Sequence, residues 1–354
     1  MRSAYIASTQ GGGGKTTISV GLCLALRNRG INAGYFKPVG TLAAHAGNQL
    51  VDEDATFVAG LLGLDDSPTD ICPVVLDEDA LHDVLEGSEV DAMRRVEAAY
   101  ARVAKGKDML VCEGLGEIWQ GRFLQTSGAE VVKRLRLATI LVAKFAGARL
   151  LDDICYVKDA LKKSMLGVIF NMVPESRLEV VEGDYTRFLA KNGIASYGAL
   201  VSNSRLSAIS IGEIADELGG TFVCGEDHRD LLAETYLIGA MSPEHALHYF
   251  QITPNKVVIV GGDRSEIVLT ALDTPTVAVV LTGNFVPSAS VVTRAEEAGV
   301  PLIAVDGDTA QAADGMRRLF GRLRVQEPGK IDLIAAIIAE RVDLDRLVGD
   351  LGDG

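Results

Sequence analysis

The segment from Ser8 to Thr17 holds the residues whose types and spacing most directly suggest chemistry. Glycines let successive backbone N–H groups point inward, and a helix that starts after them directs its positive dipole end at an anion. The pattern therefore predicts a cradle for nucleotide phosphates, in which Lys15 meets the terminal phosphates and the Thr16 hydroxyl takes one Mg²⁺ position. The predicted ligand-binding residues are Thr9, Gln10, Gly11, Gly12, Gly13, Gly14, Lys15, Thr16 and Thr17.

This loop departs from two common spellings. The usual phosphate-loop spacing has glycine where this chain has Thr9, and the loop of partition-type ATPases, which it also resembles, has a lysine where this chain has Gln10. A lysine that reaches across a dimer to the partner's nucleotide is therefore not expected from this loop. The alternative to a phosphate site is a glycine-rich turn that only caps a helix.

Three further charged residues are expected at the same sheet edge, because ligands of open parallel sheets bind beyond the carboxyl ends of the strands. Lys37 follows the apolar residues 34–36, and it either binds an anionic substrate or transferred phosphoryl group or lies exposed beside a turn. Asp54 precedes an expected helix and is either its N-cap or a Mg²⁺ ligand. Glu113 ends a very apolar strand, and a direct or indirect Mg²⁺ role is favoured because a lone buried carboxylate is costly.

Alternating strands and helices must position these residues. The alternation predicts an α/β fold in which parallel sheets are covered by helices. Polar residues near 202–210 suggest a junction, so the expected parts are 1–203, 204–325 and a C-terminal amphipathic helix with an acidic tail at 326–354. That last helix, placed at 331–351, is expected either to pack on the chain or to contact another copy. The clearest expected strands of the first part are Tyr5–Ser8, Asn32–Phe36, Met109–Cys112, Thr139–Val142 and Gly167–Phe170.

Composition limits the functional classes. The chain has 354 residues, 48% of them hydrophobic, and a net charge of −14, so a polyanion such as DNA would be repelled on average. No apolar run reaches the roughly 20 residues of a membrane span, and no signal peptide opens the chain, so a cytoplasmic location is expected. The five cysteines are scattered and show no paired metal spacing, and His245 and His248 have no further ligand nearby in sequence.

The first 200 residues resemble dethiobiotin synthetase and its relatives, which are P-loop ATP-binding proteins. The motifs that carry the resemblance are Gly14-Lys15-Thr16, Tyr35-Phe36-Lys37-Pro38-Val39, Asp54-Ala55, Val111-Cys112-Glu113-Gly114 and Gly167-Val168-Ile169-Phe170-Asn171. The resemblance implies ATP phosphates on residues 11–17 and Mg²⁺ held through Thr16, Asp54 and Glu113. It also implies an anionic group near Lys37 and the adenine edge near Asn171, for which the alternative is a strand-end turn residue.

Residues from Ile211 to about Val325 resemble the regulatory DRTGG module. The matching segments are Gly239-Ala240-Met241-Ser242, Gly262-Asp263-Arg264-Ser265, Leu281-Thr282-Gly283-Asn284 and Asp306-Gly307-Asp308-Thr309. Ser265 and Asn284 depart from the motif. The expected effector residues are Asp263, Arg264, Thr282 and Asn284, although residues 263–266 also have the spacing of a capping box, with Asp263 at the N-cap.

Together the two resemblances match the N-terminal part of long bacterial phosphotransacetylases. They imply a protein that binds Mg²⁺–ATP, hydrolyses it slowly and has a regulatory or metabolite-sensing role, without moving acetyl groups by itself. The alternative is an ATP-dependent ligase that phosphorylates a carboxylate or carbamate, as dethiobiotin synthetase-like or cobyrinate-synthase-like enzymes do. The expected partners are a nucleotide, an unidentified small anionic metabolite and a second copy of the chain, since closed dimers are the commonest oligomers.

Overall fold

The computed structural model describes residues 2–77, 82, 85–86, 91–203, 206, 208–285, 287–320 and 328–352. The chain forms two compact units. Unit 1 combines Met1–Ser202 with Val325–Gly354, and unit 2 is Asn203–Arg324. Unit 2 is therefore inserted between two parts of unit 1, and the C-terminal segment that sequence analysis set apart is grouped with unit 1.

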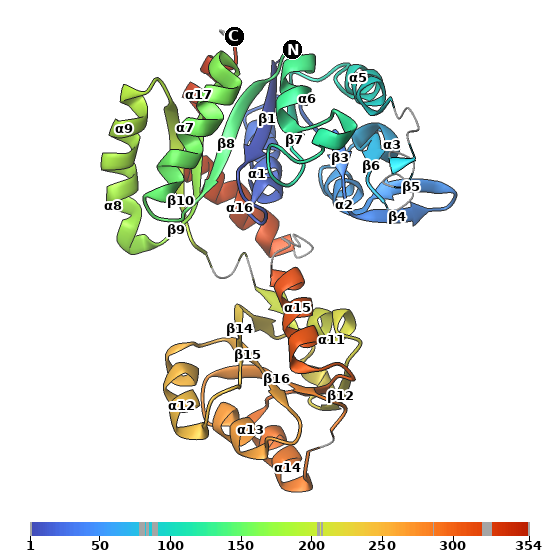
Figure 1. Ribbon diagram of the computed structural model, residues 1–354, viewed down its shortest axis with the longest axis vertical. Coiled ribbons are helices and arrows are strands. Elements are labelled where there is room, and N and C mark those ends of the chain that lie inside the picture. The colour runs from blue at the N-terminus through green and yellow to red at the C-terminus, as the bar shows by residue number, and fades with distance from the viewer. Residues whose placement is uncertain are drawn as a thin grey trace. The chain divides into compact units, whose positions relative to one another are not determined.

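Unit 1 is built on a six-stranded sheet in the order β10-β9-β8-β1-β7-β2, with every neighbouring pair parallel (Figure 1). Its strands are largely apolar because both faces are covered. They are β1 (Arg2–Ser8), β2 (Ala33–Phe36), β7 (Met109–Glu113), β8 (Ala138–Lys144), β9 (Met165–Val173) and β10 (Ala195–Val201). The short strands β3 (Val39–Gly40), β4 (Ala43–Ala46), β5 (Gln49–Asp52) and β6 (Val74–Val75) form two small two-stranded sheets beside it.

Helices cover both faces of this sheet. Parallel crossovers are right-handed, so α1, which leads from β1 past β7 to β2, lies on the face opposite to the helices of the returning connections. Those helices, α5 (Ala92–Val103), α6 (Gly128–Leu135), α7 (Arg149–Leu161) and α9 (Thr186–Lys191), pack into one core cluster with strand residues such as Tyr5 and Phe170. The remaining helices of unit 1 are α1 (Lys15–Asn28), α2 (Glu53–Leu61), α3 (Pro68–Ile71), α8 (Leu178–Val180), α16 (Pro328–Arg341) and α17 (Leu344–Asp350).

The C-terminal segment packs against α1. A Cβ at Gly21 would lie 2.5 Å from Cγ1 of Ile338 and 2.7 Å from Cγ2 of Ile334, so α16 approaches α1 at a position that only glycine allows. The prediction of one helix over 331–351 is wrong, because the chain turns between α16 and α17. There the Asp343 N–H donates to the Tyr197 carbonyl at 2.7 Å, and the Asp343 side chain caps α17.

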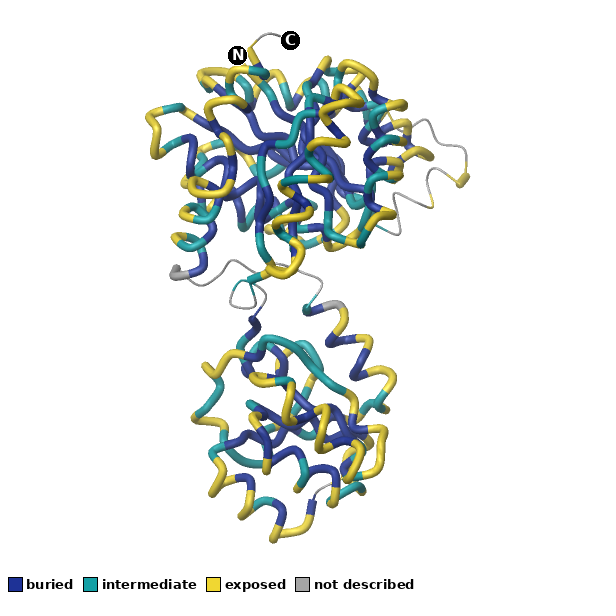
Figure 2. Tube along the Cα trace, turned by 90° about the vertical axis from the view of Figure 1, so that its left-hand side faces the viewer, coloured by how far each residue is buried: buried dark blue, intermediate teal, exposed yellow. Residues whose placement is uncertain are grey.

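Unit 2 has a five-stranded sheet in the order β12-β17-β16-β15-β14, in which only β12 runs antiparallel to its neighbour. Figure 2 shows buried strands inside each unit and more exposed helices around them. The strands of unit 2 are β11 (Ile209–Ser210), β12 (Thr221–Cys224), β13 (Leu232–Ala233), β14 (Thr235–Ile238), β15 (Lys256–Gly261), β16 (Thr276–Thr282) and β17 (Leu302–Ala304). Its helices are α11 (Ile211–Glu217), α12 (Pro243–Ile252), α13 (Ser265–Leu272), α14 (Ala289–Ala298) and α15 (Thr309–Phe320).

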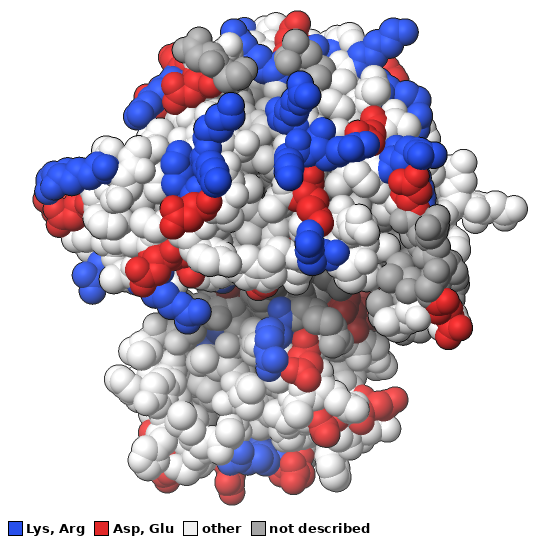
Figure 3. Space-filling model, turned by 45° about the horizontal axis from the view of Figure 1, so that its top comes forward, with Lys and Arg blue, Asp and Glu red and all other residues white. Residues whose placement is uncertain are grey.

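Charges of both signs are interspersed on the surface. Figure 3 shows acidic side chains beside many of the basic ones on the face of unit 1 that it displays. In unit 1, Arg134 pairs with Glu97 and Arg102 with Asp70, each through two hydrogen bonds. Among the described residues, no helix has the length and apolar character needed to cross a membrane.

Candidate functional site

The glycine-rich loop joins the end of β1 to the start of α1. Gly12 and Gly14 have φ angles of 64° and 86°, a backbone region that disfavours residues with a Cβ. A Cβ at Gly13 would lie 2.6 Å from Oγ of Ser8, and that hydroxyl also donates to the Gln10 carbonyl at 2.8 Å. The loop is thus compact and held at its first turn, while Gly11 and Gly12 stay exposed.

Two side chains at the start of α1 are suited to an anion. Lys15 is buried, and its ammonium group donates to the backbone carbonyl of Gly116. Burial lowers the pKa of Lys15 and the nearby Glu113 carboxylate opposes that shift. The Thr17 hydroxyl is buried and has no hydrogen-bond partner within the described part of the chain. An orphaned hydroxyl at the N-terminus of a helix, directly after a glycine loop, fits a phosphate oxygen.

Glu113 lies at the end of β7, beside the loop. Its Oε1 accepts a hydrogen bond from the Thr16 hydroxyl at 2.7 Å, and its Oε2 accepts one from the Tyr35 hydroxyl at 2.9 Å. The carboxylate is almost completely buried, as the sequence analysis assumed. Thr16 keeps its lone pairs available, since its proton points to Glu113. A divalent cation at the Thr16 oxygen is compatible with this arrangement.

Lys37 lies in a second buried group of charges. Its ammonium group is 2.7 Å from Oδ1 of Asp52 and 3.6 Å from Oδ2 of Asp54. Burial alone would lower the pKa of Lys37, but Glu113, Asp52 and Asp54 together raise that pKa above its usual range. Lys37 is therefore buried and charged, and the exposed position beside a turn is wrong.

Asp52 has the capping role that sequence analysis offered as one alternative for Asp54. The Asp52 carboxylate accepts from the backbone N–H groups of Ala55 at 2.9 Å and Leu42 at 3.0 Å, and it caps α2. The side chain of Asp54 is 38% exposed and lies within α2. The N-cap alternative for Asp54 is wrong, and its part in binding a cation stays a prediction.

Asn171 reaches the phosphate loop directly. Its Nδ2 donates to the Gly13 carbonyl at 2.9 Å, and a Cβ at Gly14 would clash with the same amide. Asn171 is buried within β9, so the strand-end turn alternative is wrong. The amide supports the loop in this structure, and a contact with adenine stays a prediction.

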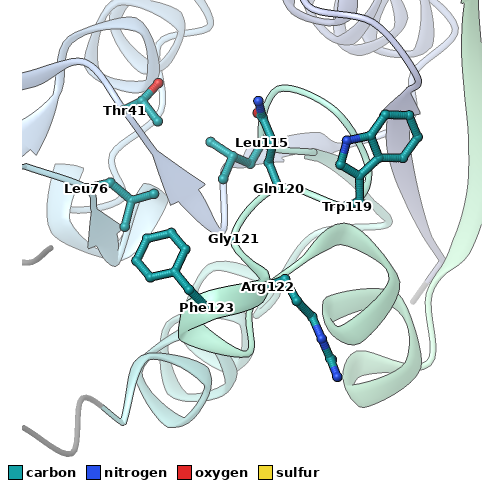
Figure 4. A pocket seen from close by; sticks show the side chains of 8 residues that line it. All are labelled: Thr41, Leu76, Leu115, Trp119, Gln120, Gly121, Arg122 and Phe123. Carbon is teal, nitrogen blue, oxygen red and sulfur yellow. The ribbon is translucent and has the colours of Figure 1, made fainter. Parts of the chain in front are cut away.

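The loop after Glu113 borders a cavity of about 670 Å³. Figure 4 shows Leu115, Leu76 and Phe123 around it, together with Thr41 from the segment that follows Lys37. Because β2 and β7 are neighbours, the loops that leave their carboxyl ends meet here. An apolar cavity thus lies where two loops next to the charged group converge.

Two residues of the site were not assigned from the sequence. The sequence does not single out Asp52, because residues 52–54 are three acids in a row and only the fold decides which one is buried. Tyr35 belongs to the motif at residues 35–39, which gives this tyrosine no role. Its position on β2 is diagonal to Glu113 on β7, since Tyr35 is in register with Val111. Strand alternation, which puts residues 111 and 113 on one face, was the available signal.

In unit 2 the four expected effector residues lie at the carboxyl ends of β15 and β16, which are neighbours. Arg264 donates to the carbonyls of Gly239 at 2.6 Å and Met241 at 2.9 Å, so its guanidinium group fastens a neighbouring loop. The Thr282 hydroxyl pairs with that of Thr309 at 2.9 Å. Asp263 is exposed, and Asn284 has a left-handed backbone with a φ of 54°.

The predicted capping box of α13 is wrong. Arg264 occupies the N-cap position, and no side-chain hydrogen bond caps the helix. The helix begins one residue later than the spacing suggested, because the Arg264 N–H donates to the Gly261 carbonyl in a turn that precedes the helix. An effector role for these residues stays a prediction.

Comparison with known proteins places both units. A family model described as AAA domain matches residues 2–210, and one described as DRTGG domain matches residues 213–319. The phosphate acetyltransferase of Pseudomonas aeruginosa is 24% identical over 98% of this chain and 52% of its own length. The chain thus spans about half the length of the curated relatives that it matches end to end.

Two other similarities cover less of the chain. The ATP-dependent dethiobiotin synthetase BioD of Caldicellulosiruptor bescii is 30% identical over 33% of this chain and 49% of its own. Among solved structures, the MinD cell division protein of Aquifex aeolicus covers 58% of this chain and 84% of its own at 16% identity, with a TM-score of 0.37, too low to argue from. The chain belongs to the AAA domain family, in its dethiobiotin synthetase-like P-loop form, and joins this domain to a DRTGG domain.

Proposed function

We propose that unit 1 binds Mg²⁺–ATP, hydrolyses it slowly and uses the nucleotide in a regulatory role that involves unit 2. The observation that carries this proposal is the orphaned, buried Thr17 hydroxyl at the start of α1, next to the glycine loop. Lys15, which is also buried there, would hold the terminal phosphates, and Lys37 would lie near the transferred group. Thr16, Glu113 and Asp54 would hold the cation. Bound magnesium would neutralise charge on the phosphates.

The chain's own groups supply positioning and charge. The phosphates must replace the Gly116 carbonyl as the partner of the Lys15 ammonium group. The hydrogen bond to the carbonyl is lost, and a stronger one forms, because both of its partners are charged. The Lys37 ammonium group is held by Asp52, so it cannot turn away from the site without leaving the buried Asp52 carboxylate without its counter-charge. Neither step requires a nucleophilic side chain of the protein.

The regulatory role is supported by the arrangement of the chain. The relatives that match from end to end are phosphate acetyltransferases, and this chain corresponds to about half of their length. The DRTGG region shows loops fastened by Arg264. A small anionic metabolite sensed by this unit is part of the proposal.

One observation favours a second candidate function. The cavity lined by Leu115 and Thr41 is linked to the charged group at Lys37 through Leu42, the next residue, whose N–H donates to Asp52. An acceptor carboxylate or carbamate could be phosphorylated there. This is the ATP-dependent ligase alternative. A strong stimulation of ATP turnover by one carboxylate, or by one amine with bicarbonate, would put it first.

The test is isothermal titration calorimetry of ATP and GTP, with and without Mg²⁺. We expect Mg²⁺-dependent ATP binding to the wild type and its loss in Lys15→Ala. Lys133→Ala, which removes an exposed lysine from α6, is the matched control and should bind as the wild type does. Absence of binding to both nucleotides by the wild type would refute the proposal.

A further inference from the structure

Glu113 receives a hydrogen bond from each of two hydroxyl groups, and only one of them belongs to the phosphate loop. The Thr16 bond to Oε1 is 2.7 Å long, and the Tyr35 bond to Oε2 is 2.9 Å long. Tyr35 comes from β2, and Thr16 from α1. The carboxylate is therefore held at both oxygens, from a strand and from a helix.

The Tyr35 hydroxyl acts only as a donor in this position. Its side chain is completely buried, and its hydroxyl donates to Oε2 of Glu113 at 2.9 Å. Because an ionised carboxylate can only accept hydrogen bonds, the phenol proton points at it. The contact is also fixed by the sheet, because β2 and β7 are paired in parallel and Tyr35 lies opposite Val111, two residues before Glu113.

We propose that Tyr35 is a positioning residue for the divalent cation, acting through Glu113 and Thr16. With Oε2 held by Tyr35, the carboxylate is oriented so that Oε1 takes the Thr16 proton, and the Thr16 oxygen then presents a lone pair to the cation. Without the phenol, the carboxylate can rotate, and one of its buried oxygens loses its partner. This inference rests on the proposed function, because it concerns the cation that accompanies the nucleotide.

The size of the effect follows from the behaviour of groups that orient metal ligands. Removing such a partner typically weakens metal binding by about 10- to 100-fold. Tyr35→Phe keeps the ring and its packing and removes only the oxygen. We expect at least a tenfold rise in the Mg²⁺ concentration that half-saturates nucleotide binding, while the Kd for ATP without Mg²⁺ stays within about twofold of the wild type.

The experiment measures ATP binding by calorimetry at a series of Mg²⁺ concentrations. It uses the full chain as the wild type, Tyr35→Phe and Tyr100→Phe. Tyr100 is the matched control, because its hydroxyl is 2.8 Å from Oγ of Ser3, near the start of β1 and far along the strand from the phosphate loop. A thermal melt of each protein without ligands accompanies the titration. A general loss of packing would lower the melting temperature without a selective change in the Mg²⁺ midpoint.

The outcomes separate the two proposals. A raised Mg²⁺ midpoint in Tyr35→Phe alone supports the inference. Mg²⁺-dependent ATP binding in the wild type with an unchanged midpoint in Tyr35→Phe, or an equal shift in Tyr100→Phe, overturns the inference and leaves the proposed function standing. A wild type that binds no nucleotide in the presence of Mg²⁺ overturns both.

Discussion

Lys256 should make the stability of unit 2 depend on pH in an unusual direction. Its side chain is fully buried at the start of β15, and its ammonium group donates to Oγ1 of Thr274 at 3.2 Å and to the Pro275 carbonyl at 3.1 Å. It also lies 5.6 Å from the ring centre of Phe250. No ion pair with Lys256 is found in the part of unit 2 that the structure describes. Burial lowers the pKa of Lys256 from 10.5 to about 8.

The magnitude follows from these two pKa values. At pH values between about 8 and 10.5, Lys256 is protonated in the unfolded chain and mostly neutral in the folded one. The unfolded chain therefore binds more protons, and the free energy of unfolding rises with pH. The unfavourable contribution is fully present below about pH 8 and disappears as the pH rises through 10.5. From pH 7 to pH 9.5 the gain is about 2 kcal/mol, or roughly 25-fold in the opening equilibrium. Lys256 is the one lysine between residues 203 and 324, which simplifies the assignment.

The assay is hydrogen exchange of the β15 and β16 amides in the wild type and in Lys256→Met, compared at each pH so that intrinsic exchange rates cancel. The protection of the wild type relative to the variant should increase roughly 25-fold from pH 7 to pH 9.5. Lost hydrogen bonds in the variant do not depend on pH and drop out of this comparison. Lys191→Met, at an exposed position of α9, is the control. A ratio that stays constant within twofold over this range would refute the reasoning.

Two further predictions concern unit 1. Gly21→Val should force α16 away from α1, because the added carbons overlap α16, and should lower the stability of unit 1 by about 1–3 kcal/mol, measured as a lower urea midpoint. Gly183→Val, at a site with open space, is the control. An unchanged midpoint in Gly21→Val would contradict the tight packing. ATP with Mg²⁺ should change the fluorescence of Trp119, the single tryptophan, because the phosphates must release Lys15 from the loop that carries Trp119. Lys15→Ala should abolish this response. An equal response in that variant would count against the replacement of the Gly116 carbonyl by phosphate as the partner of Lys15.

The phosphate loop could be predicted from the sequence because its information is local. The loop consists of a buried strand, a run of glycines and the Lys15-Thr16 pair, which follow one another directly in the sequence. The positive φ angles at Gly12 and Gly14 fall on glycines, as the local sequence suggests. The same holds for Glu113, which directly follows a strand whose apolar character identifies it. The parallel sheets followed from the alternation of strands and helices, and the order of the strands did not.

The charged group around Lys37 could not be resolved from the sequence. Asp52 and Asp54 are chemically equal, and the choice between them depends on which way α2 leaves the sheet. In this structure Lys15 donates to the Gly116 carbonyl, and because every residue has a backbone carbonyl, the sequence does not indicate this partner. The turn between α16 and α17 likewise depends on a distant contact, the Tyr197 carbonyl that accepts the Asp343 N–H. Tertiary contacts decided all three features.

The insertion of unit 2 has a consequence for the order in which the protein is made. The face of α1 that packs on α16 is synthesised near the beginning of the chain, and α16 near its end. Roughly 140 residues separate the end of β10 from the end of α16, which at about 5–20 residues per second is a delay on the order of 10 s. During that time α1 lacks the helix that covers it, while unit 2 is synthesised and completed before α16. A ribosome that stalls after unit 2 therefore holds a finished DRTGG domain and an AAA domain in which the face of α1 that packs on α16 is still open to chaperones and to other nascent chains.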